Sequence, residues 1–392
     1  MSHHPVIVDA IRTPTGRGKP GGALSTIHPV DLLAGILEAL VSRNGIDPGR
    51  VDDVIIGCVT QIGEQTFAPR MAVLGAGFPE HVPATSIDRK CGSSQQAIHF
   101  AAHAIAAGAC DIVIAGGVES MSHVPIGSNR LGKDIAGEKV RQRYAPGLVS
   151  QGVGAELIAA RWGITREELD EYSAISHARA AAATTSGAFA EEIVAVDTEN
   201  GVFRHDETVR ESTTAEGLAG LKPVFVDPAM EERFPEISWG VTAGNSSQLA
   251  DAAAAVLMMS EDMAKKLNLR PRARFVAFDV MGNDPLLMLT APIPVTRRVL
   301  GKAGLSTADI NHFEVNEAFA SVPLAWIKDL QVDPQFVNPR GGAIALGHPL
   351  GASGARLMTT MLHALEASGG RYGLQTMCEN GGMANATIIE RL

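Results

Sequence analysis

Cys91 is the first residue of this sequence whose type and position could support chemistry. It follows the strand-like run 84–88 and begins a stretch of small residues typical of a helix. Free backbone N–H groups and the helix dipole favour an anion at such a position, so the pattern predicts a thiol that ionises readily and acts as a nucleophile. The alternative is a buried, unreactive cysteine, and Cys91 alone does not decide between the two.

Three further side chains occupy comparable junctions. Asn316 follows an apolar run, His348 lies in the Gly- and Pro-rich loop 347–354, and Cys378 precedes a glycine pair. Open α/β sheets build sites at strand ends, imidazole suits a general base, and backbone amides near glycines can hold an oxyanion. Each residue alone also fits a structural role as a helix cap, a loop histidine or a core cysteine. Together they favour a nucleophile, a base, a second acid/base and an oxyanion site.

The composition is that of a globular chain with a large core. The 392 residues are 45% hydrophobic and 19% charged, and the formal net charge is −10. This charge argues against nucleic-acid partners and an anionic membrane surface, and no apolar stretch is long enough to predict a membrane span. The four cysteines, Cys58, Cys91, Cys110 and Cys378, form no close pair and no zinc spacing. We therefore expect reduced thiols, no metal, and a cytoplasmic location without a signal peptide.

The elements that must position these residues alternate between apolar strands and Ala-rich helices, which indicates an α/β protein. They also form two similar halves. A helix–turn–strand unit at 29–57 recurs at 294–315, and the helix–strand unit that begins at Cys91 recurs at 353–378. Chance resemblance of two α/β segments is the alternative to a duplicated domain.

A stretch of different character lies between the halves. It is richer in Arg, Glu, Gly and Pro, and Thr165 with Glu168 predicts a capped helix start. Loops carried on a rigid core often confer specificity, so we expect this stretch to cover the ligand. The predicted division is a first half at 1–119 plus 250–270, a loop domain at 120–249 and a second half at 271–392.

Five motifs together resemble the thiolase family, over residues 6–392. They are Cys-Gly-Ser at 91–93, Thr-Ala-Gly-Asn-Ser-Ser at 242–247, Asn-Glu-Ala-Phe at 316–319, Gly-His-Pro at 347–349 and the cysteine at 378. Each motif alone is weak, but five in family order across the full length are specific. The resemblance implies a five-layered αβαβα fold of two duplicated halves with an inserted loop domain. It also implies homodimers, commonly paired into homotetramers.

The resemblance implies a role for each candidate residue. Cys91 would carry the acyl group as a thioester, His348 would activate Cys91, and Cys378 would move the proton at the α-carbon of acetyl-CoA. Asn316 with His348 would form one oxyanion site, through a bound water on the Asn316 side, and the backbone amides of Cys91 and Asn380 the other. Contacts with CoA and the acyl group are implied for Ser247, Ala243, Ala318, Phe319 and Met288. CoA is a substrate, and no cofactor is expected.

The sequence departs from the family pattern at four places. Asn380 stands where glycine is usual, and because Asn tolerates a positive φ we expect its backbone amide to keep its orientation. Ser94 replaces a common glycine, and residues 289–292 replace a frequent Gly-x-Gly-Pro beside the acyl pocket. Residues 150–156 lack the His-Met of members that form acetoacetyl-CoA, which favours acyl chains longer than acetyl.

We therefore expect a thiolase, an acetyl-CoA C-acyltransferase that serves fatty-acid β-oxidation or similar acyl-chain catabolism. One alternative is a biosynthetic acetoacetyl-CoA thiolase, which would use the same catalytic residues. Another is a condensing enzyme acting on carrier proteins, which would not need Cys378. A third, from a different class, is a non-catalytic acyl-CoA-binding protein of the same fold, and the presence of every candidate side chain argues against it.

Overall fold

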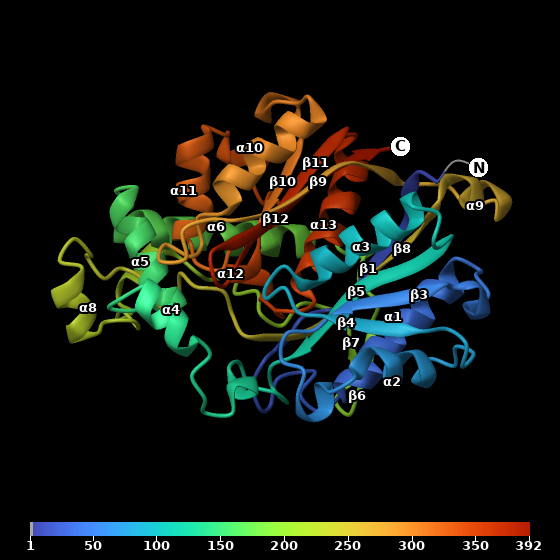
Figure 1. Ribbon diagram of the computed structural model, residues 1–392, viewed down its shortest axis with the longest axis horizontal. Coiled ribbons are helices and arrows are strands. Elements are labelled where there is room, and N and C mark those ends of the chain that lie inside the picture. The colour runs from blue at the N-terminus through green and yellow to red at the C-terminus, as the bar shows by residue number, and fades with distance from the viewer. Residues whose placement is uncertain (1–2) are drawn as a thin grey trace.

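The computed structural model describes residues 3–392, which form a mixed α/β structure (Figure 1). Its strands are β1 (Pro5–Arg12), β2 (Gly16–Arg17), β3 (Asp53–Gly57), β4 (Ala84–Ile87), β5 (Ile112–Ser120), β6 (Val196–Thr198), β7 (Gly201–Phe203), β8 (Ala250–Ser260), β9 (Ala273–Gly282), β10 (His312–Val315), β11 (Tyr372–Glu379) and β12 (Met383–Arg391). Its α-helices are α1 (Pro29–Arg43), α2 (Ala68–Gly75), α3 (Ser93–Ala106), α4 (Gly137–Arg143), α5 (Gln151–Arg161), α6 (Arg166–Thr185), α7 (Ala215–Ala219), α8 (Pro228–Arg233), α9 (Glu261–Lys266), α10 (Pro292–Ala303), α11 (Ser321–Leu330), α12 (Ala343–Leu346) and α13 (Ser353–Ser368). Short 3-10 helices are η1 (Pro48–Arg50), η2 (Gly63–Gln65), η3 (Ser128–Arg130), η4 (Thr307–Asp309) and η5 (Pro334–Phe336).

The main sheet runs through the whole molecule. Over residues 3–392 it has ten strands, in the order β10-β11-β12-β9-β1-β8-β5-β3-β4 with β2 paired to β8. Its two halves meet at β1 and β9, where Val6 pairs with Arg274 and Ile7 with Ala273. β8, which follows the inserted stretch, pairs with both β1 and β5. The predicted domain boundaries themselves stay a prediction.

Helices cover both outer faces of the sheet and fill the space between its halves (Figure 1). α1 and α2 lie outside the N-terminal half, α10 and α11 lie outside the C-terminal half, and α3 and α13 pack between them. The result is five layers, αβαβα, which confirms the expected fold class. The outer N-terminal, central and outer C-terminal apolar clusters include Leu33, Leu37 and Leu257, then Ile98, Met358 and Leu362, then Val299, Phe313 and Trp326.

The two central helices approach each other closely, and this approach places the start of α3 against the start of α13. A Cβ added to Gly354 would lie 2.4 Å from Gln95 N, so only glycine fits there. Ser94 Oγ accepts a hydrogen bond from Ala355 N at 2.8 Å. Ser94, which replaces a common family glycine, thus contributes a bond between the halves.

Several predicted elements match the structure closely. The helix of the helix–strand unit predicted at 353–378 is α13 (Ser353–Ser368), which begins at the predicted residue, and the helix start expected at Thr165 is a capping box. Glu168 N donates to Thr165 Oγ1 at 3.2 Å, and Thr165 N donates to Glu168 Oε2 at 2.8 Å. These elements were predictable because a short sequence pattern determines each of them locally.

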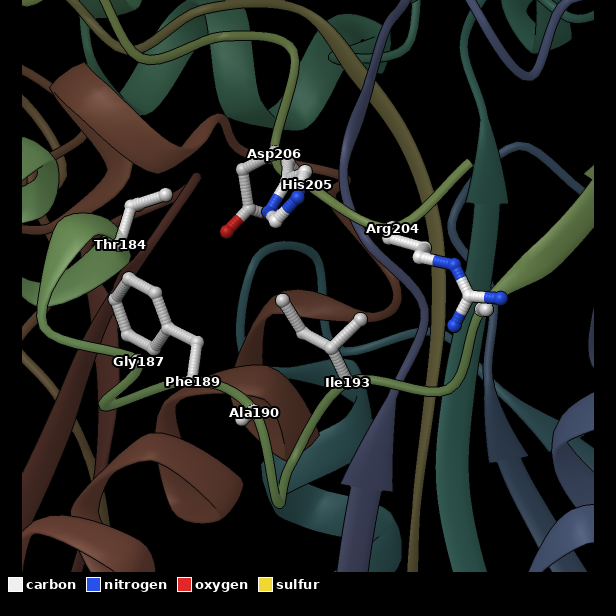
Figure 2. A pocket seen from close by; sticks show the side chains of 9 residues that line it. Thr184, Gly187, Phe189, Ala190, Ile193, Arg204, His205 and Asp206 are labelled. Atoms are coloured by element: carbon white, nitrogen blue, oxygen red, sulfur yellow. The ribbon is translucent and has the colours of Figure 1, made fainter. Parts of the chain in front are cut away.

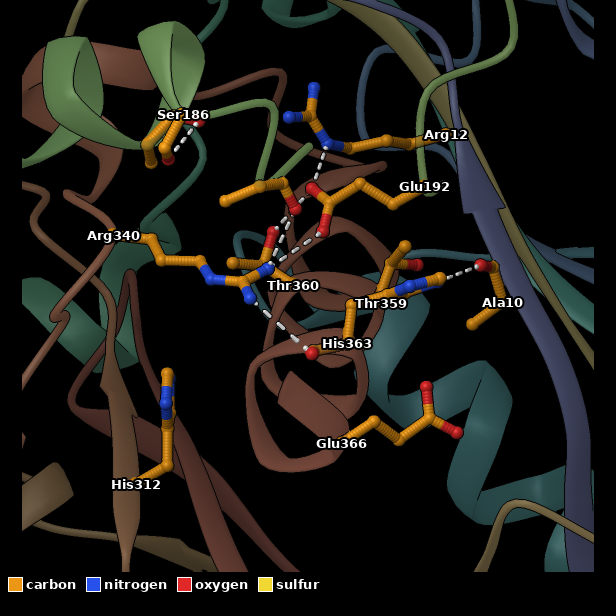
Figure 3. Close-up of polar contacts among 12 residues, drawn as sticks. Ala10, Arg12, Ser186, Glu192, His312, Arg340, Thr359, Thr360, His363 and Glu366 are labelled. Carbon is orange, nitrogen blue, oxygen red and sulfur yellow. Dashed lines mark hydrogen bonds and ion pairs between the residues drawn. The ribbon is translucent and has the colours of Figure 1, made fainter. Parts of the chain in front are cut away.

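A buried ion cluster ties residues 184–206 to the core (Figure 3). Arg12, fully buried at the end of β1, donates from Nε to Glu192 Oε1 at 2.7 Å. Its two Nη groups donate to both carboxylate oxygens of Asp206, at 2.7 and 3.0 Å. Thr360 of α13 donates to the same Glu192 oxygen at 3.0 Å. One guanidinium therefore neutralises two buried carboxylates that the chain supplies far from β1.

Arg12→Leu is expected to lower the free energy of unfolding by about 3–5 kcal/mol, because it leaves Asp206 buried without this counter-ion and Glu192 with only Arg340, 3.8 Å away. Chemical denaturation followed by tryptophan fluorescence measures the change. The matched control is Arg297→Leu, which removes an exposed ion pair with Asp329 and should cost less than about 1 kcal/mol. Equal losses in the free energy of unfolding for the two substitutions would contradict the claim that the buried ion pairs stabilise the fold more than the exposed one.

Candidate active site

Cys91 is buried just ahead of the first turn of α3, with 5% of its surface exposed. It belongs to a small apolar cluster with Leu350, from the His348 loop, and Met377, which precedes Cys378. The start of α3, the His348 loop and the carboxyl end of β11 therefore meet at Cys91. This meeting agrees with the prediction from the sequence that Cys91, His348 and Cys378 belong to one site.

The resting Cys91 thiol is not easily ionised. Its pKa is raised well above the ordinary value, first by burial and then by the neighbouring Cys378 and Glu379. The prediction of a thiol that ionises readily is therefore wrong for the resting enzyme. A helix N-terminus stabilises an anion by at most about 2 kcal/mol, and here burial removes the water that would solvate a thiolate. Cys91 needs a base to act as a nucleophile.

His348 has the protonation state of such a base. Ser353 Oγ donates to Pro349 O at 2.9 Å and lies 2.6 Å from His348 Nδ1. Because the hydroxyl proton is already used, Nδ1 carries the proton and donates to Oγ, which leaves the lone pair on Nε2. That Nε2 is buried and has no hydrogen-bond partner among residues 3–392. Burial, and then Arg356, lowers the pKa of His348 to about 3, so the imidazole is neutral near pH 7.

Asn316 and Cys378 are neighbours at the carboxyl ends of the parallel strands β10 and β11. Asn316 Nδ2 donates to Cys378 Sγ at 3.8 Å, and Asn316 Oδ1 is buried without a partner in the described part of the chain. Burial raises the pKa of Cys378 to about 12, against the opposing effect of the Asn316 hydrogen bond. Cys378 is therefore a neutral thiol that can give a proton and take it back.

Asn380 lies in the turn between β11 and β12. The positive φ angles of this turn belong to Gly381, at 92°, and Gly382, at 80°, and among the described residues Asn380 is not one with positive φ. The expectation that Asn380 would use a positive φ is therefore wrong, because the two glycines that follow it make the turn. The aim of its backbone amide at an acyl oxygen stays a prediction.

Most residues expected to contact CoA and the acyl group gather around Cys378. Ala318, Phe319 and Met288 share its apolar cluster. Ser247 joins them, because its backbone N–H donates to Ala318 O at 3.0 Å. Met288 has a φ of 53°, a strained conformation for a residue other than glycine, and such strain is often found at functional sites.

The residues just before the segment 242–247 are held by α5, another element of the loop domain. Glu156 of α5 accepts hydrogen bonds from Gly240 N at 3.0 Å and Val241 N at 2.7 Å. Ala243 is exposed in the turn that follows, outside the Cys378 cluster. One end of the segment thus faces solvent and the other the apolar cluster, which suits a ligand with polar and apolar parts.

Two buried carboxylates that the sequence analysis missed fix the loops of the site. Glu119, in β5, accepts hydrogen bonds from Val59 N at 2.9 Å, Thr60 N at 3.1 Å and Gly351 N at 2.8 Å. It therefore holds the His348 loop against the end of β3. The sequence feature that could have predicted this role is the position of Glu119, a single carboxylate within an otherwise apolar strand.

Glu317 is the second carboxylate, and it fixes the position of Asn316. It accepts four hydrogen bonds, from Tyr172 Oη at 2.9 Å, Ser176 Oγ at 2.8 Å, Asn338 Nδ2 at 2.9 Å and Ile344 N at 3.1 Å. Two of these donors are on α6, so the bonds join the loop domain to the end of β10 and to α12.

Glu317→Gln is expected to lower kcat about tenfold and the free energy of unfolding by about 2–3 kcal/mol. The new amide N–H₂ would face hydrogen-bond donors, which leaves buried groups unpaired and displaces Asn316. Steady-state kinetics and denaturant unfolding measure the two effects. Glu138→Gln, at an exposed position of α4, is the control and should change stability by less than about 0.5 kcal/mol.

Two cavities lie away from Cys91. The cavity in Figure 2, of about 250 Å³, lies beside Phe189, Ile193 and Asp206 and includes none of the predicted site residues. A second cavity of about 350 Å³ lies at the start of α5 and is lined by Leu148, Val149, Ser150, Val153, Val224, Phe225, Val226, Asp227 and Met230. Phe225 makes an edge-to-face contact with Phe319 at 5.8 Å between ring centroids. Phe225 therefore lines the second cavity and also packs against the Cys378 cluster.

The sequence matches two family models, the thiolase N-terminal domain over residues 5–262 and the thiolase C-terminal domain over residues 269–391. It is 51% identical to steroid 3-ketoacyl-CoA thiolase FadA6 of Mycobacterium tuberculosis, over 98% of this chain and 94% of that protein. It is 46% identical to the 3-ketoacyl-CoA thiolase of Klebsiella pneumoniae, over 99% of both chains.

A solved structure agrees with this assignment. The crystal structure of the Bacillus anthracis acetyl-CoA acetyltransferase superposes with a TM-score of 0.88 at 39% identity, covering 100% of this chain and 99% of that one. The resemblance inferred from five motifs is thereby confirmed over both halves of the sheet. The chain belongs to the thiolase family of acyltransferases.

Proposed function

We propose that this thiolase cleaves 3-ketoacyl-CoA with CoA, giving acyl-CoA and acetyl-CoA in a degradative pathway. The observation that carries the proposal is that Cys91, Cys378 and the loop of His348 meet, with both thiols neutral and with His348 Nε2 unpartnered in the described chain. A nucleophile, a base and a separate proton donor are what carbon–carbon cleavage through an acyl-enzyme requires.

In the first half-reaction, His348 Nε2 takes the Cys91 proton as Sγ attacks the 3-keto carbon. The alkoxide then collapses, the C2–C3 bond breaks, and its electron pair leaves on the enolate of acetyl-CoA. Cys378 gives its proton to the enolate carbon and becomes a thiolate. The products are acetyl-CoA and acyl-Cys91. We assign the enolate oxygen to protonated His348 and, through a bound water, to Asn316.

In the second half-reaction, the Cys378 thiolate takes the proton of incoming CoA, whose sulfur attacks the Cys91 thioester. The backbone amides of Cys91 and Asn380 would hold the oxyanion, and His348 returns its proton to Cys91 as the bond breaks. Every proton and electron pair is then accounted for by the chain and CoA. The scheme therefore calls for no metal and no cofactor, and CoA remains a substrate.

We infer that the acyl group is larger than acetyl. Phe225, which lines the cavity at the start of α5, makes an edge-to-face contact with Phe319 of the Cys378 cluster. Open space beside α5 therefore lies next to residues expected to contact the acyl group. The relatives named as steroid 3-ketoacyl-CoA and 3-ketoacyl-CoA thiolases favour the same substrate class. Acetoacetyl-CoA is the competing substrate, favoured by the name of the solved acetyl-CoA acetyltransferase.

We also propose a homodimer or homotetramer in the cytoplasm. β4 is the terminal strand of the main sheet, and α2, which packs on it, exposes Met71 and Leu74. An uncovered edge strand beside exposed apolar side chains suits pairing with a second copy. A reducing compartment keeps both proposed catalytic thiols free. Among the described residues, no helix is long and apolar enough to cross a membrane.

The proposal is tested by incubating the enzyme with 3-ketoacyl-CoAs, quenching in acid and mapping acyl adducts by peptide mass spectrometry. The adduct is expected on Cys91, with the mass of the acyl group shortened by two carbons. A thiolysis series from acetoacetyl-CoA to long, branched and ring-bearing substrates ranks kcat/KM. An adduct elsewhere would contradict the nucleophile, and a maximum at acetoacetyl-CoA would contradict the substrate class.

A further inference from the structure

Glu379, the last residue of β11, carries a buried carboxylate that the proposed reaction does not use. It is fully buried, and within residues 3–392 neither Oε1 nor Oε2 has a hydrogen-bond partner. Folded proteins almost always give buried polar atoms a partner, so a carboxylate with two unpartnered oxygens needs an explanation.

The carboxylate lies against the backbone next to Cys91. A Cβ added to Gly92 would lie 2.1 Å from Glu379 Oε1. Gly92 has a φ of −86°, which any residue can adopt, so glycine is required here by space and not by backbone conformation. Glu379 also follows Cys378 directly in the chain. Glu379 thus lies against both catalytic segments without taking part in either proposed step.

Charged and polar groups face Glu379 from two elements. The loop before α3 contributes Asp88 and Arg89, and Arg89 Nε is buried without a partner in the described chain. β12 contributes Asn385, whose Nδ2 donates to Gly92 O at 3.0 Å. Burial, partly opposed by Arg89 and aided by Asp88, raises the pKa of Glu379 to about 8. The carboxyl group is therefore uncharged near pH 7.

The two thiols complete the surroundings of Glu379. Ionised Glu379 raises the pKa of Cys91, after the larger effects of burial and Cys378. It also raises the pKa of Cys378, after burial and against the hydrogen bond from Asn316. Acidic groups that repel one another in a dry site titrate as a coupled set.

We propose that Glu379 is a positioning residue for acyl transfer: its uncharged carboxyl lets Cys91 and Cys378 become thiolates in turn, and loss of its proton suppresses thiolate formation. The inference rests on the proposed function, in which each thiol carries the negative charge at one stage. Cys91, Cys378 and Glu379 then carry one negative charge among them. Raising the pH ionises Glu379 first, and its charge opposes formation of the Cys91 thiolate and so lowers the reactivity of Cys91.

The test is the pH dependence of Cys91 alkylation by iodoacetamide, read from the modified peptide between pH 6 and 10. In Glu379→Gln the thiolate should form about one pH unit lower, so that Cys91 alkylation at pH 9 is about tenfold faster than in the wild type. Glu138→Gln, on the exposed face of α4, should leave the profile unchanged. A Glu379→Gln profile that overlays the wild type would overturn the proposal.

Arg89→Gln keeps the test decisive if Glu379→Gln does not fold. Removing this positive charge should keep Glu379 protonated to higher pH, so alkylation of Cys91 at pH 9 should be faster than in the wild type. If Arg89 instead acted by stabilising the Cys91 thiolate directly with its positive charge, its removal would slow alkylation, and that result would overturn the proposal. Acyl mapping on the wild type distinguishes failure of the proposed function from failure of the Glu379 proposal. If no adduct forms on Cys91, the proposed function fails, and the role of Glu379 fails with it.

Discussion

Cys91→Ala is expected to lower kcat/KM for thiolysis by at least about 10⁴-fold. The substitution removes the atom that forms the acyl-enzyme, and the remaining groups can only orient the substrate and stabilise an oxyanion. His348 would keep its tautomer, because that tautomer is set by Ser353 and Pro349, and their hydrogen bonds do not involve the Cys91 sulfur. Steady-state thiolysis assays and loss of the acyl adduct measure the effect together.

The controls separate chemistry from folding. Cys110→Ala removes a half-buried thiol that has no place in the proposed reaction, and its activity should match the wild type. The Cys91 cluster is small, so loss of the sulfur should cost only about 1 kcal/mol of stability, visible as a small change in melting temperature. A folded Cys91→Ala enzyme with more than a hundredth of wild-type activity would rule out Cys91 as the nucleophile.

The layers of the fold were predictable because local patterns repeat in the two halves. Apolar strand runs, Ala-rich helices and glycine turns recur, and a glycine such as Gly354 already indicates close helix packing. The grouping of Cys91 with His348 and Cys378 was predictable from the paired halves and the family motifs, but the apolar neighbours of Cys91 were not. Leu350 and Met377 meet it from segments far along the chain, and no local pattern predicts such a meeting.

The electrostatics of the site were the part that the sequence could not supply. A cysteine at a helix start suggests an anion, whereas the folded protein buries Cys91 beside Cys378 and Glu379 and raises its pKa. The outcome depends on the balance between helix dipole and burial, and burial follows from tertiary packing. The tautomer of His348 likewise depends on one hydroxyl, that of Ser353, whose own partner is fixed by the loop geometry.

Asn380 illustrates the same limit on a smaller scale. The sequence expected it to take over the positive φ of the usual glycine, but Gly381 and Gly382 already provide the turn. The neighbouring Glu379 was passed over, although it shares the buried space beside Gly92. The departure from the family pattern thus pointed to a turn of the site, and the backbone angles within that turn follow from the two glycines after Asn380.

Cys378→Ala is expected to lower the rate of α-proton exchange of acetyl-CoA by about 10²–10⁴-fold, the usual range for loss of a general acid or base. Transfer of the acetyl group between CoA and Cys91 breaks no carbon–hydrogen bond, and a CoA thiol of ordinary pKa, about 8.5, can exchange its proton with water when Cys378 is missing. Isotope exchange between acetyl-CoA and free CoA should therefore fall less than deuterium uptake. Deuterium uptake at the acetyl methyl group, followed by NMR in D₂O, and exchange of labelled CoA are measured on the same preparation.

The two readouts distinguish a proton carrier from a packing residue. Cys378 is fully enclosed with Asn316 and the Phe319 cluster, so a merely structural sulfur would slow both exchanges together when removed. Cys378→Ser, which keeps a hydroxyl of higher pKa near Asn316 Nδ2, should recover the packing but little of the deuterium uptake. Normal deuterium uptake in either variant would remove Cys378 from the mechanism, whereas selective loss of uptake with CoA exchange retained requires that its thiol moves the α-proton.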